Sequence, residues 1–521
     1  MRTGNGRLMS NKVSMVKNIL SNISGYFVSI LTAFIITPIT IHTLGDARYG
    51  AWALVGELIG YYGLLDLGFR GAVTYHVARY SSLNKSEEIK ETLSSAFWIL
   101  TVLGALVFLI GAGITIWFQY IFKNDGLNLT EVRYALLIMS GLIGLSLPIN
   151  AFSGGIVGKE RFDVVTGIEV LNRVLTAICL YIVLKNGGGL VALALVQVFG
   201  RAISWTITLI SCRKILGGIF ARPKWFRMET VRDLVGYGFR NAIGQVALLV
   251  IYRVDLTVVA IFVGIKEVAI YSIASSLVSY ASTLGSTIAQ TFTPRFTKLA
   301  SCEDNNELAD MYFLGMRTIG MVITGMVAGM LVFGKDFIHL WIGASYINGP
   351  WTNRSDVIMV ILILANLPRM LQSISWQRLF AMARVRFLMW LNVCEAIANL
   401  SLSILFVKYY GAAGVALGTF FPLMVSHLIV MPIYSSRAFN IPLAILFRKG
   451  LAVPLITGMS MAIISLVLNR MVPPDRWWIF FCEIILVGII GILLCFRIGF
   501  STDERKKYFT WIYERTFAHA S

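Results

Sequence analysis

The chain has 521 residues, of which 57% are hydrophobic and only 14% are charged, and its mean hydropathy is +0.74. Ordinary globular domains carry about 25% charged residues, so this composition excludes a water-soluble fold and indicates a chain that folds in lipid. The net charge of +18 does not predict a nucleic-acid partner, because most basic residues occupy short loops between apolar segments.

Apolar segments long enough to cross a bilayer recur along the whole chain. The first, 19–44, follows a basic N-terminus but is too long for the core of a signal peptide, so we expect it in the mature protein. We predict an all-α polytopic membrane protein with about fourteen transmembrane helices. Their expected bounds are 18–43, 49–79, 92–121, 132–157, 163–184, 189–212, 233–262, 268–296, 309–334, 356–380, 386–407, 412–436, 451–471 and 476–497.

The distribution of Lys and Arg predicts the orientation of these helices. Basic residues collect in the N-terminal tail and in segments such as 79–90, 213–232 and 437–449, while the loops on the other side hold few. Cytoplasmic loops carry the basic excess in membrane proteins, so both termini are expected in the cytoplasm. Aromatic residues among the charges of 213–232 and 503–521 favour helices that lie in the cytosolic interface, although a solvated tail remains open for 503–521.

A weak internal repeat with a period of about 220 residues divides the chain. Pro148 of the fourth expected helix corresponds to Pro368 of the tenth, and Asn172 corresponds to Asn392. Two six-helix lobes in the same order imply an axis along the membrane normal, which is a transporter architecture. Chance similarity between hydrophobic helices is the alternative. The expected domains are an N-terminal lobe (1–213), a cytosolic interfacial linker (214–232), a C-terminal lobe (233–440), helices thirteen and fourteen (441–500) and a cytosolic tail (501–521).

No motif of a soluble enzyme is found. The segment from Gly154 to Glu160 is similar to a phosphate loop, but its spacing is wrong and Glu160 replaces the residue that would hold magnesium. The five histidines lack metal-ligand spacing, and the six cysteines form no CxxC pair. We therefore expect a protein that is not an enzyme and has neither a catalytic residue nor a metal or cofactor.

Arginines inside the expected helices point to function. Arg173, Arg201, Arg253 and Arg369 lie near helix centres, where an Arg facing lipid costs ~2.5–3.5 kcal/mol. They must therefore face protein or a water-filled cavity. Local pairing is the plainer interpretation at two positions, because Asp66 precedes Arg70 and Glu169 precedes Arg173 by four residues. The full set predicts a cationic interior for an anionic cargo: Arg70, Arg173, Arg201, Arg240, Arg253, Arg317 and Arg369 against Glu57, Asp66, Glu169, Asp255 and Glu395.

Two further patterns concern a transport path. Glu57 and Arg253 lie at matching depths, roughly 12–15 Å below the outer surface at 1.5 Å per residue, so they form an outer latch if the second and seventh helices face each other. The eighth helix has a polar stripe that suits sugar hydroxyls or water, with a helix-packing face as the alternative. Its members are Ser275, Ser279, Ser282, Ser286, Gln290 and Thr293.

Short motifs at corresponding places in the two halves resemble those of the Wzx-type oligosaccharide flippases. That family belongs to the group that also holds lipid II flippases and multidrug extruders. The resemblance covers the first twelve expected helices. The motifs lie at 44–45, 49–52, 64–69, 237–238, Asp255, 263–264 and 269–274.

The resemblance implies a flippase that moves an undecaprenyl-diphosphate-linked oligosaccharide repeat unit to the outer leaflet of a bacterial inner membrane for surface polysaccharide biosynthesis. Alternating access would serve such transport, and the polysaccharide polymerase machinery is an expected partner besides membrane lipids. A cation-coupled multidrug extruder and a lipid II flippase are the alternatives. The residues expected to bind substrate are Arg70, Arg240, Arg253, Ser279 and Gln290, and those expected to couple or gate transport are Glu57, Asp66 and Asp255.

Overall fold

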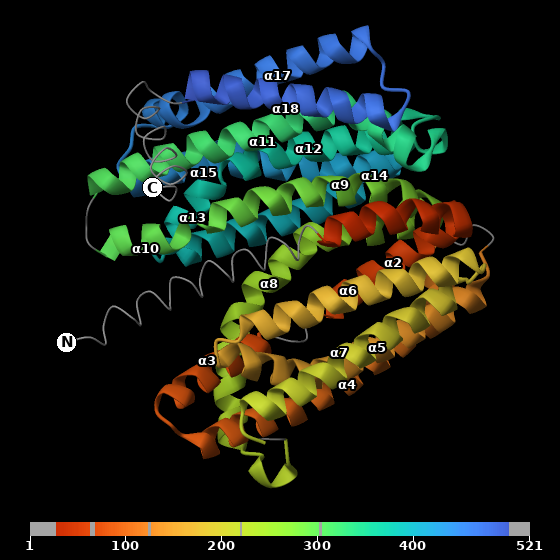
Figure 1. Cartoon of the computed structure of the whole chain (residues 1–521), viewed down its shortest axis with the longest axis vertical. Helices are drawn as coiled ribbons and strands as arrows, with labels where there is room; N and C mark the ends of the chain where they lie inside the picture. Colours follow the sequence, from red (N-terminus) through yellow and green to blue (C-terminus); the bar gives the residue numbers. More distant parts are fainter. Residues whose placement is uncertain (1–27, 63–67, 123–126, 219–220, 302–304, 500–521) are drawn as a thin grey trace, which may run out of the picture. The chain divides into compact units, whose positions relative to one another are not determined.

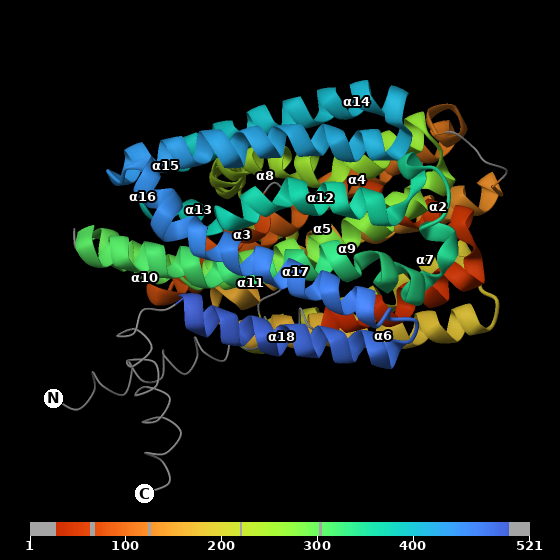
Figure 2. The same cartoon turned by 90° about the horizontal axis from the view of Figure 1, so that it is seen from above.

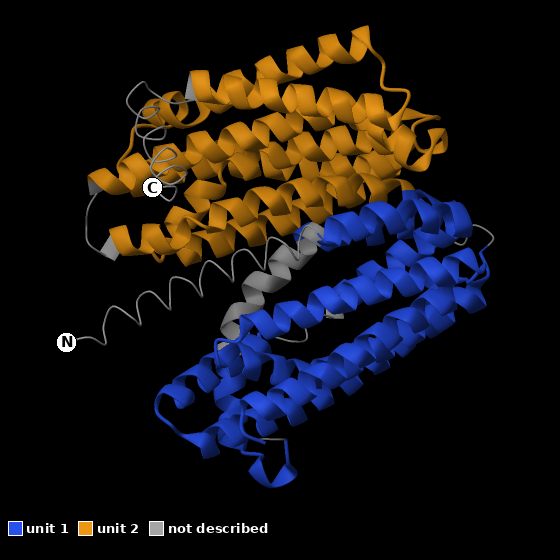
Figure 3. Ribbon diagram, viewed as in Figure 1, with its two compact units in different colours: residues 1–269 blue, residues 270–521 orange. Residues whose placement is uncertain are grey.

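The computed structural model describes residues 28–62, 68–122, 127–218, 221–301 and 305–499. Within these residues the chain is helical, without a strand. It divides into two compact units, Met1–Ala269 and Ile270–Ser521 (Figure 3). The lobe boundaries expected from the repeat stay a prediction, and the expected tail at 501–521 lies outside the described residues.

The first unit is a bundle of long helices. It begins with the apolar helix Val28–Leu44. The helices that follow are α2 (Asp46–Tyr62), α3 (Phe69–Ser82), α4 (Ser86–Ile121), α5 (Leu129–Gly158), α6 (Phe162–Lys185), α7 (Leu190–Ile215), the single turn η2 (Pro223–Trp225) and α8 (Met228–Phe262).

Small residues hold the centre of this bundle together. A Cβ added at Gly104 of α4 would lie 2.2 Å from the carbonyl oxygen of Gly144 on α5, so the two backbones touch. In lipid, where hydrophobicity does not drive helices together, such close packing is a main source of their association. Helices α4, α5 and α7 accordingly run side by side (Figure 1).

The segment that follows α7 is fixed to α4. The backbone N–H of Arg222 donates to the Ser94 hydroxyl (3.1 Å), and that of Arg227 donates to the Ser95 hydroxyl (3.0 Å). Lys90 lies over the ring of Trp225, with 5.3 Å from Nζ to the ring centroid. Among the described residues 221–227, helical structure is therefore limited to η2, which differs from the expected interfacial helix because side chains of α4 take the backbone donors.

The second unit contains the remaining helices and two π-helical turns. Its elements are most of α9 (Ile265–Gln290), α10 (Thr293–Ser301), α11 (Asn305–Ile342), η3 (Ala344–Tyr346), η4 (Trp351–Asn353), α12 (Ser355–Leu371), α13 (Ser373–Ala381), α14 (Val385–Met424), the π-helix η5 (Val425–Val430), α15 (Met431–Phe439), α16 (Leu443–Ile445), the π-helix η6 (Leu446–Leu451), α17 (Ala452–Met471) and α18 (Trp477–Gly499).

Helix α14 is a tight hairpin of two antiparallel helices. Gly411 has φ 54° and ψ −137°, a conformation that breaks the helix and that glycine adopts without strain. On either side of it, Asn399 donates to the hydroxyl of Thr419 (2.9 Å). The apolar stretch that contains α14 therefore holds two antiparallel helices, in agreement with the expected helices 386–407 and 412–436.

Helices α11, α17 and α18 form a further layer of the second unit, in which they lie next to one another in both views (Figures 1 and 2). Thr324 on α11 donates its hydroxyl hydrogen to the carbonyl of Pro454 on α17 (2.8 Å). A Cβ added at Gly458 would lie 2.5 Å from the Thr324 Cβ, so the helices are in close contact here as well.

The described residues contain 10 stretches that are long and apolar enough to cross a membrane, and a shorter apolar helix at Val28–Leu44. The protein is thus an integral, multi-pass helical membrane protein, as predicted, while the count of fourteen stays a prediction. One expected helix, 49–79, is interrupted: α2 ends at Tyr62, and α3 starts after Gly68, whose φ of 72° is left-handed.

Candidate functional site

The contact between α2 and α8 joins two of the predicted site residues. Nη1 of Arg253 lies 3.3 Å from Oε2 of Glu57. The Glu57 side chain is 9% exposed, whereas that of Arg253 is 44% exposed. A buried carboxylate therefore pairs with an arginine whose side chain stays partly exposed. The structure confirms that these two side chains meet, and their role as a latch stays a prediction.

Neighbouring residues on both helices shape this contact. Glu57, Gly60 and Tyr61 share one face of α2, because residues three and four apart lie together on a helix. A Cβ at Gly60 would lie 2.7 Å from Nη1 of Arg253, so a larger residue there would require the guanidinium to move from its present position. The Tyr61 hydroxyl lies 2.9 Å from the Arg253 carbonyl oxygen and 3.1 Å from the Thr257 hydroxyl, which ties α2 to α8 one turn further on.

The other predicted residues of this unit lie on α8 and α3 or outside the described residues. Asp255 lies on α8, two residues after Arg253, and is buried. Arg70 lies in the first turn of α3 and is partly buried. Asp66 and the side chain of Arg240 lie outside the described residues. Among the described side chains of these predicted residues, Glu57 and Arg253 form an ion pair, and Asp255 is close enough to act electrostatically on Glu57.

The polar stripe of the eighth expected helix lies on α9. Ser279 and Gln290 are both exposed, whereas the hydroxyl oxygen of Ser282 is buried, so the accessible polar face stays a prediction. Gln290 is the last residue of α9, and Thr293 begins α10, so the stripe does not continue along one helix as expected. Thr293 instead donates to the side-chain oxygen of Gln377 on α13 (2.8 Å).

Two other intramembrane arginines have acidic partners on different helices. Arg201 of α7 pairs with Glu169 of α6 at 3.3 Å, and both side chains are 40% exposed. Arg369 of α12 pairs with Glu395 of α14, also at 3.3 Å. Neither arginine has an acid four residues away on its own helix, so these partners were not visible in the sequence.

Glu395 is the centre of a buried polar cluster in the second unit. Its side chain is 1% exposed and that of Arg369 is 15% exposed. Its second oxygen accepts a hydrogen bond from the Ser426 hydroxyl (2.8 Å) and lies 3.2 Å from Nε2 of His427, which is 2% exposed. Ser426 and His427 reach it from the π-helix η5, and such π-turns often occur at functional sites.

Sequence reasoning missed both this cluster and a second buried cation. Arg378 of α13 is 3% exposed, and its guanidinium carbon lies 4.0 Å from the ring centroid of Phe439 and 5.1 Å from that of Tyr312. Rings face a desolvated arginine favourably. A signal was available for His427, a polar residue inside an apolar segment, whereas the ring contacts of Arg378 depend on folding.

The apolar helices, in two units and with ion pairs between helices, define a multi-pass helical membrane protein. The lipid II flippase MurJ in an inward closed conformation has the same fold: TM-score 0.71, 16% identity, with 92% of this chain and 99% of that chain covered. A multidrug resistance MATE transporter of the MOP superfamily, in its inward-facing conformation, gives a TM-score of 0.64 at 13% identity, over 81% of this chain and 98% of the other.

The chain belongs to the family of polysaccharide biosynthesis proteins, which matches residues 15–300. A relative from Shigella flexneri, assigned as an O-antigen transporter, is 21% identical over 428 residues, which cover 81% of this chain and 98% of the relative. The family match includes every helix of the first unit and the ion pair between Glu57 and Arg253.

Proposed function

We propose that the protein is a flippase that moves a polyprenyl-diphosphate-linked oligosaccharide repeat unit from the inner to the outer leaflet by alternating access. The observation that carries the proposal is membership of the polysaccharide biosynthesis family across residues 15–300. The O-antigen assignment of the Shigella flexneri relative supports the same cargo class. The likeness to MurJ and MATE transporters concerns the fold alone, so it supports neither lipid II nor a drug as the cargo.

In this proposal Arg253 contacts the diphosphate. Its guanidinium is held from one side by Glu57 and remains 44% exposed. A planar guanidinium that is already oriented loses little freedom on binding and donates two parallel hydrogen bonds to phosphate oxygens. Arg70 and Arg240 provide further positive charge, and Ser279 and Gln290 contact the sugars.

Glu57, Asp66 and Asp255 are the proposed coupling or gating groups. An arriving diphosphate competes with Glu57 for Arg253, so binding of cargo weakens the link between α2 and α8. The proposed orientation places both termini in the cytoplasm of a bacterial inner membrane. The membrane potential then favours export of an anion by ~2.3 kcal/mol per charge per 100 mV. Delivery to a polysaccharide polymerase on the outer side completes the proposed pathway.

The test combines gene deletion with analysis of lipid-linked glycans and surface polysaccharide. We expect the deletion strain to lose surface polymer and to accumulate undecaprenyl-linked repeat units on the cytosolic leaflet. Wild type should restore the polymer and Arg253→Ala should not. Arg201→Ala is the matched control, because Arg201 also pairs with a glutamate at 3.3 Å in the same unit but is not a proposed substrate contact.

Two other phenotypes of the deletion strain would favour the drug extruder or the lipid II flippase instead. Intact surface polymer together with new sensitivity to cationic drugs would replace the flippase by an extruder. Arrested peptidoglycan synthesis with normal surface polysaccharide would replace the cargo by lipid II. Because Arg253 is also the proposed diphosphate contact, the informative outcome for the latch is recovery, by the charge-swapped variant Glu57→Arg/Arg253→Glu, of activity lost in the single variants, which would support it.

A further inference from the structure

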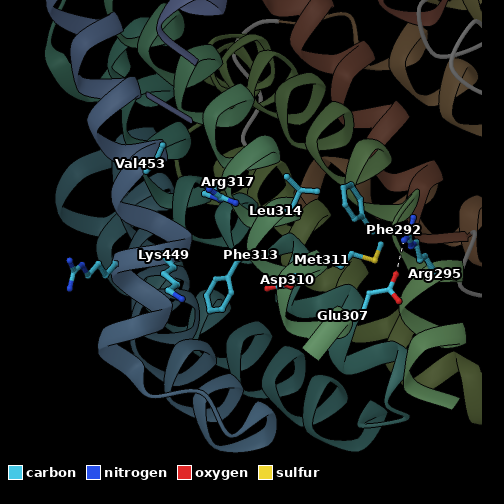
Figure 4. Close-up of a pocket in the computed structure, with 11 residues that line it drawn as sticks. Phe292, Arg295, Glu307, Asp310, Met311, Phe313, Leu314, Arg317, Lys449 and Val453 are labelled. Atoms are coloured by element: carbon cyan, nitrogen blue, oxygen red, sulfur yellow. Dashed lines mark hydrogen bonds and ion pairs between the residues drawn. The ribbon is translucent and has the colours of Figure 1, made fainter. Parts of the chain in front are cut away.

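A pocket of about 710 Å³ lies in the second unit, and its lining includes none of the residues proposed above as substrate contacts. Its walls come from the junction of α9 and α10, from one face of the N-terminal part of α11, and from η6 with the start of α17. Figure 4 shows Arg317, Phe313 and Lys449 towards one side and Arg295 with Glu307 towards the other.

The charge of this pocket is positive. Four basic side chains line it (Arg295, Arg317, Arg448 and Lys449) against two acids, Glu307 and Asp310, which leaves a net charge of +2. Arg295 and Glu307 already form an ion pair at 2.8 Å. Arg448 and Lys449 are exposed, so their charges are available to a ligand.

The remaining wall is apolar. Phe292, Met311, Phe313, Leu314 and Val453 supply it. Lys449 extends over the ring of Phe313, with 5.9 Å from Nζ to the ring centroid. A cation next to an aromatic and aliphatic surface is suited to a molecule with a charged end and an apolar end.

The two walls are held at a fixed separation by close helix packing. A Cβ added at Gly450 of η6 would lie 2.9 Å from the sulfur of Met316, so η6 packs directly on α11. One turn further on, a Cβ at Gly320 would lie 2.6 Å from Cγ of Pro454. The basic residues of η6 and Arg317 therefore belong to one preformed site.

The depth of Arg317 fits a membrane interface. It lies about twelve residues, or roughly 18 Å, along α11 from the start of the helix at Asn305. After Arg317 the helix becomes continuously apolar. The basic segments 295–298 and 437–449 are on the predicted cytosolic side, where anionic lipids attract basic clusters. A basic pocket between helices at this level matches the chemistry of a lipid phosphate.

We propose that this pocket binds the phosphate-bearing headgroup of a membrane lipid, with Arg317, Arg448 and Lys449 at the phosphate and the apolar wall along the first carbons of the chain. The cargo polyprenyl diphosphate and a resident anionic phospholipid share this chemistry. The site does not depend on the proposed transport activity, because it is defined by binding.

The test is native mass spectrometry of the delipidated full-length protein in detergent. The probes are cardiolipin, undecaprenyl diphosphate, phosphatidylcholine as the net-neutral lipid, and inorganic diphosphate. Arg448→Gln/Lys449→Gln removes two exposed charges with little risk to folding, and Arg317→Gln tests the partly buried one. Arg384→Gln/Arg386→Gln is the matched control, since it removes two exposed charges of the same unit outside the pocket.

We expect saturable binding of at least one anionic lipid. A basic residue near a lipid phosphate contributes about fivefold to affinity, so the Arg448/Lys449 variant should bind about 25-fold more weakly and the control variant should bind normally. The stronger of the two anionic lipids identifies the occupant. Equal losses in the pocket and control variants would overturn the proposal, and so would inorganic diphosphate that binds as tightly as the lipids.

Discussion

Replacement of Glu395 by Gln tests whether the buried charges of the second unit depend on one carboxylate. Gln keeps the size of the side chain and can still accept from Ser426, but it removes the negative charge next to Arg369. Because Arg369 is only 15% exposed, water cannot replace the lost partner. Removal of one member of a buried ion pair costs about 3–5 kcal/mol, and we expect Glu395→Gln to lose this much unfolding free energy.

The Glu57→Gln variant is the matched comparison within the same protein. The pairs have the same 3.3 Å separation, but Arg253 is 44% exposed. Its guanidinium can be solvated after the change, so the expected loss is about 1 kcal/mol or less. Arg369→Met combined with Glu395→Gln should recover most of the stability, because removal of both charges leaves no unpaired buried ion.

The assay is equilibrium unfolding of the purified full-length variants by SDS in mixed micelles, followed by helical circular dichroism. The difference between the two single variants is the measured quantity, since it cancels errors common to both extrapolations. Losses that agree to within about 1 kcal/mol would refute the reasoning, because burial of the partner would then not set the cost.

Two glycine substitutions give further predictions. Gly60→Ala should displace the guanidinium of Arg253, which lies 2.7 Å from the added Cβ. This variant should lower surface-polymer complementation several-fold without loss of thermal stability. Gly56→Ala is the control and should complement normally, because its added Cβ meets nothing within 4 Å. Gly418→Ala should cost about 1–3 kcal/mol by overpacking, since its Cβ would lie 2.4 Å from a backbone nitrogen of the facing helix in the α14 hairpin. Gly488→Ala, in open space, should be neutral or slightly stabilising in the same thermal-unfolding assay, and equal losses at both positions would contradict the packing argument.

The helical membrane fold could be predicted because its signal is local. About twenty apolar residues in succession indicate a segment that is surrounded by lipid. The two halves of the hairpin at Gly411 are each long enough to give this signal. Breaks inside apolar segments are less visible. Gly68 interrupts the expected helix 49–79 by adopting φ 72°, but glycine also occurs at helix-packing positions such as Gly104.

The candidate site was predictable only in part. The expected depths of Glu57 and Arg253 in the membrane predicted this pair. Depth alone was sufficient, because few acidic residues lie inside the expected helices. The pairs Arg201–Glu169 and Arg369–Glu395 were not predicted, because partners for these arginines were sought only four residues away on the same helix. Which face each helix turns to its neighbour depends on packing, and this information is absent from residue spacing along a single helix.

The π-helix η5 has a consequence for how related sequences compare. A π-turn accommodates one more residue than an α-helical turn, and each residue rotates the helix by about 100°. A deletion in a regular α-helix would turn the later part by that angle, whereas deletion of a single residue within Val425–Val430 would convert the π-turn to an α-helical turn and leave the later part in its orientation. Homologues are expected to differ in length by one residue at this point, and those without the extra residue should lack a histidine that reaches the position of Glu395.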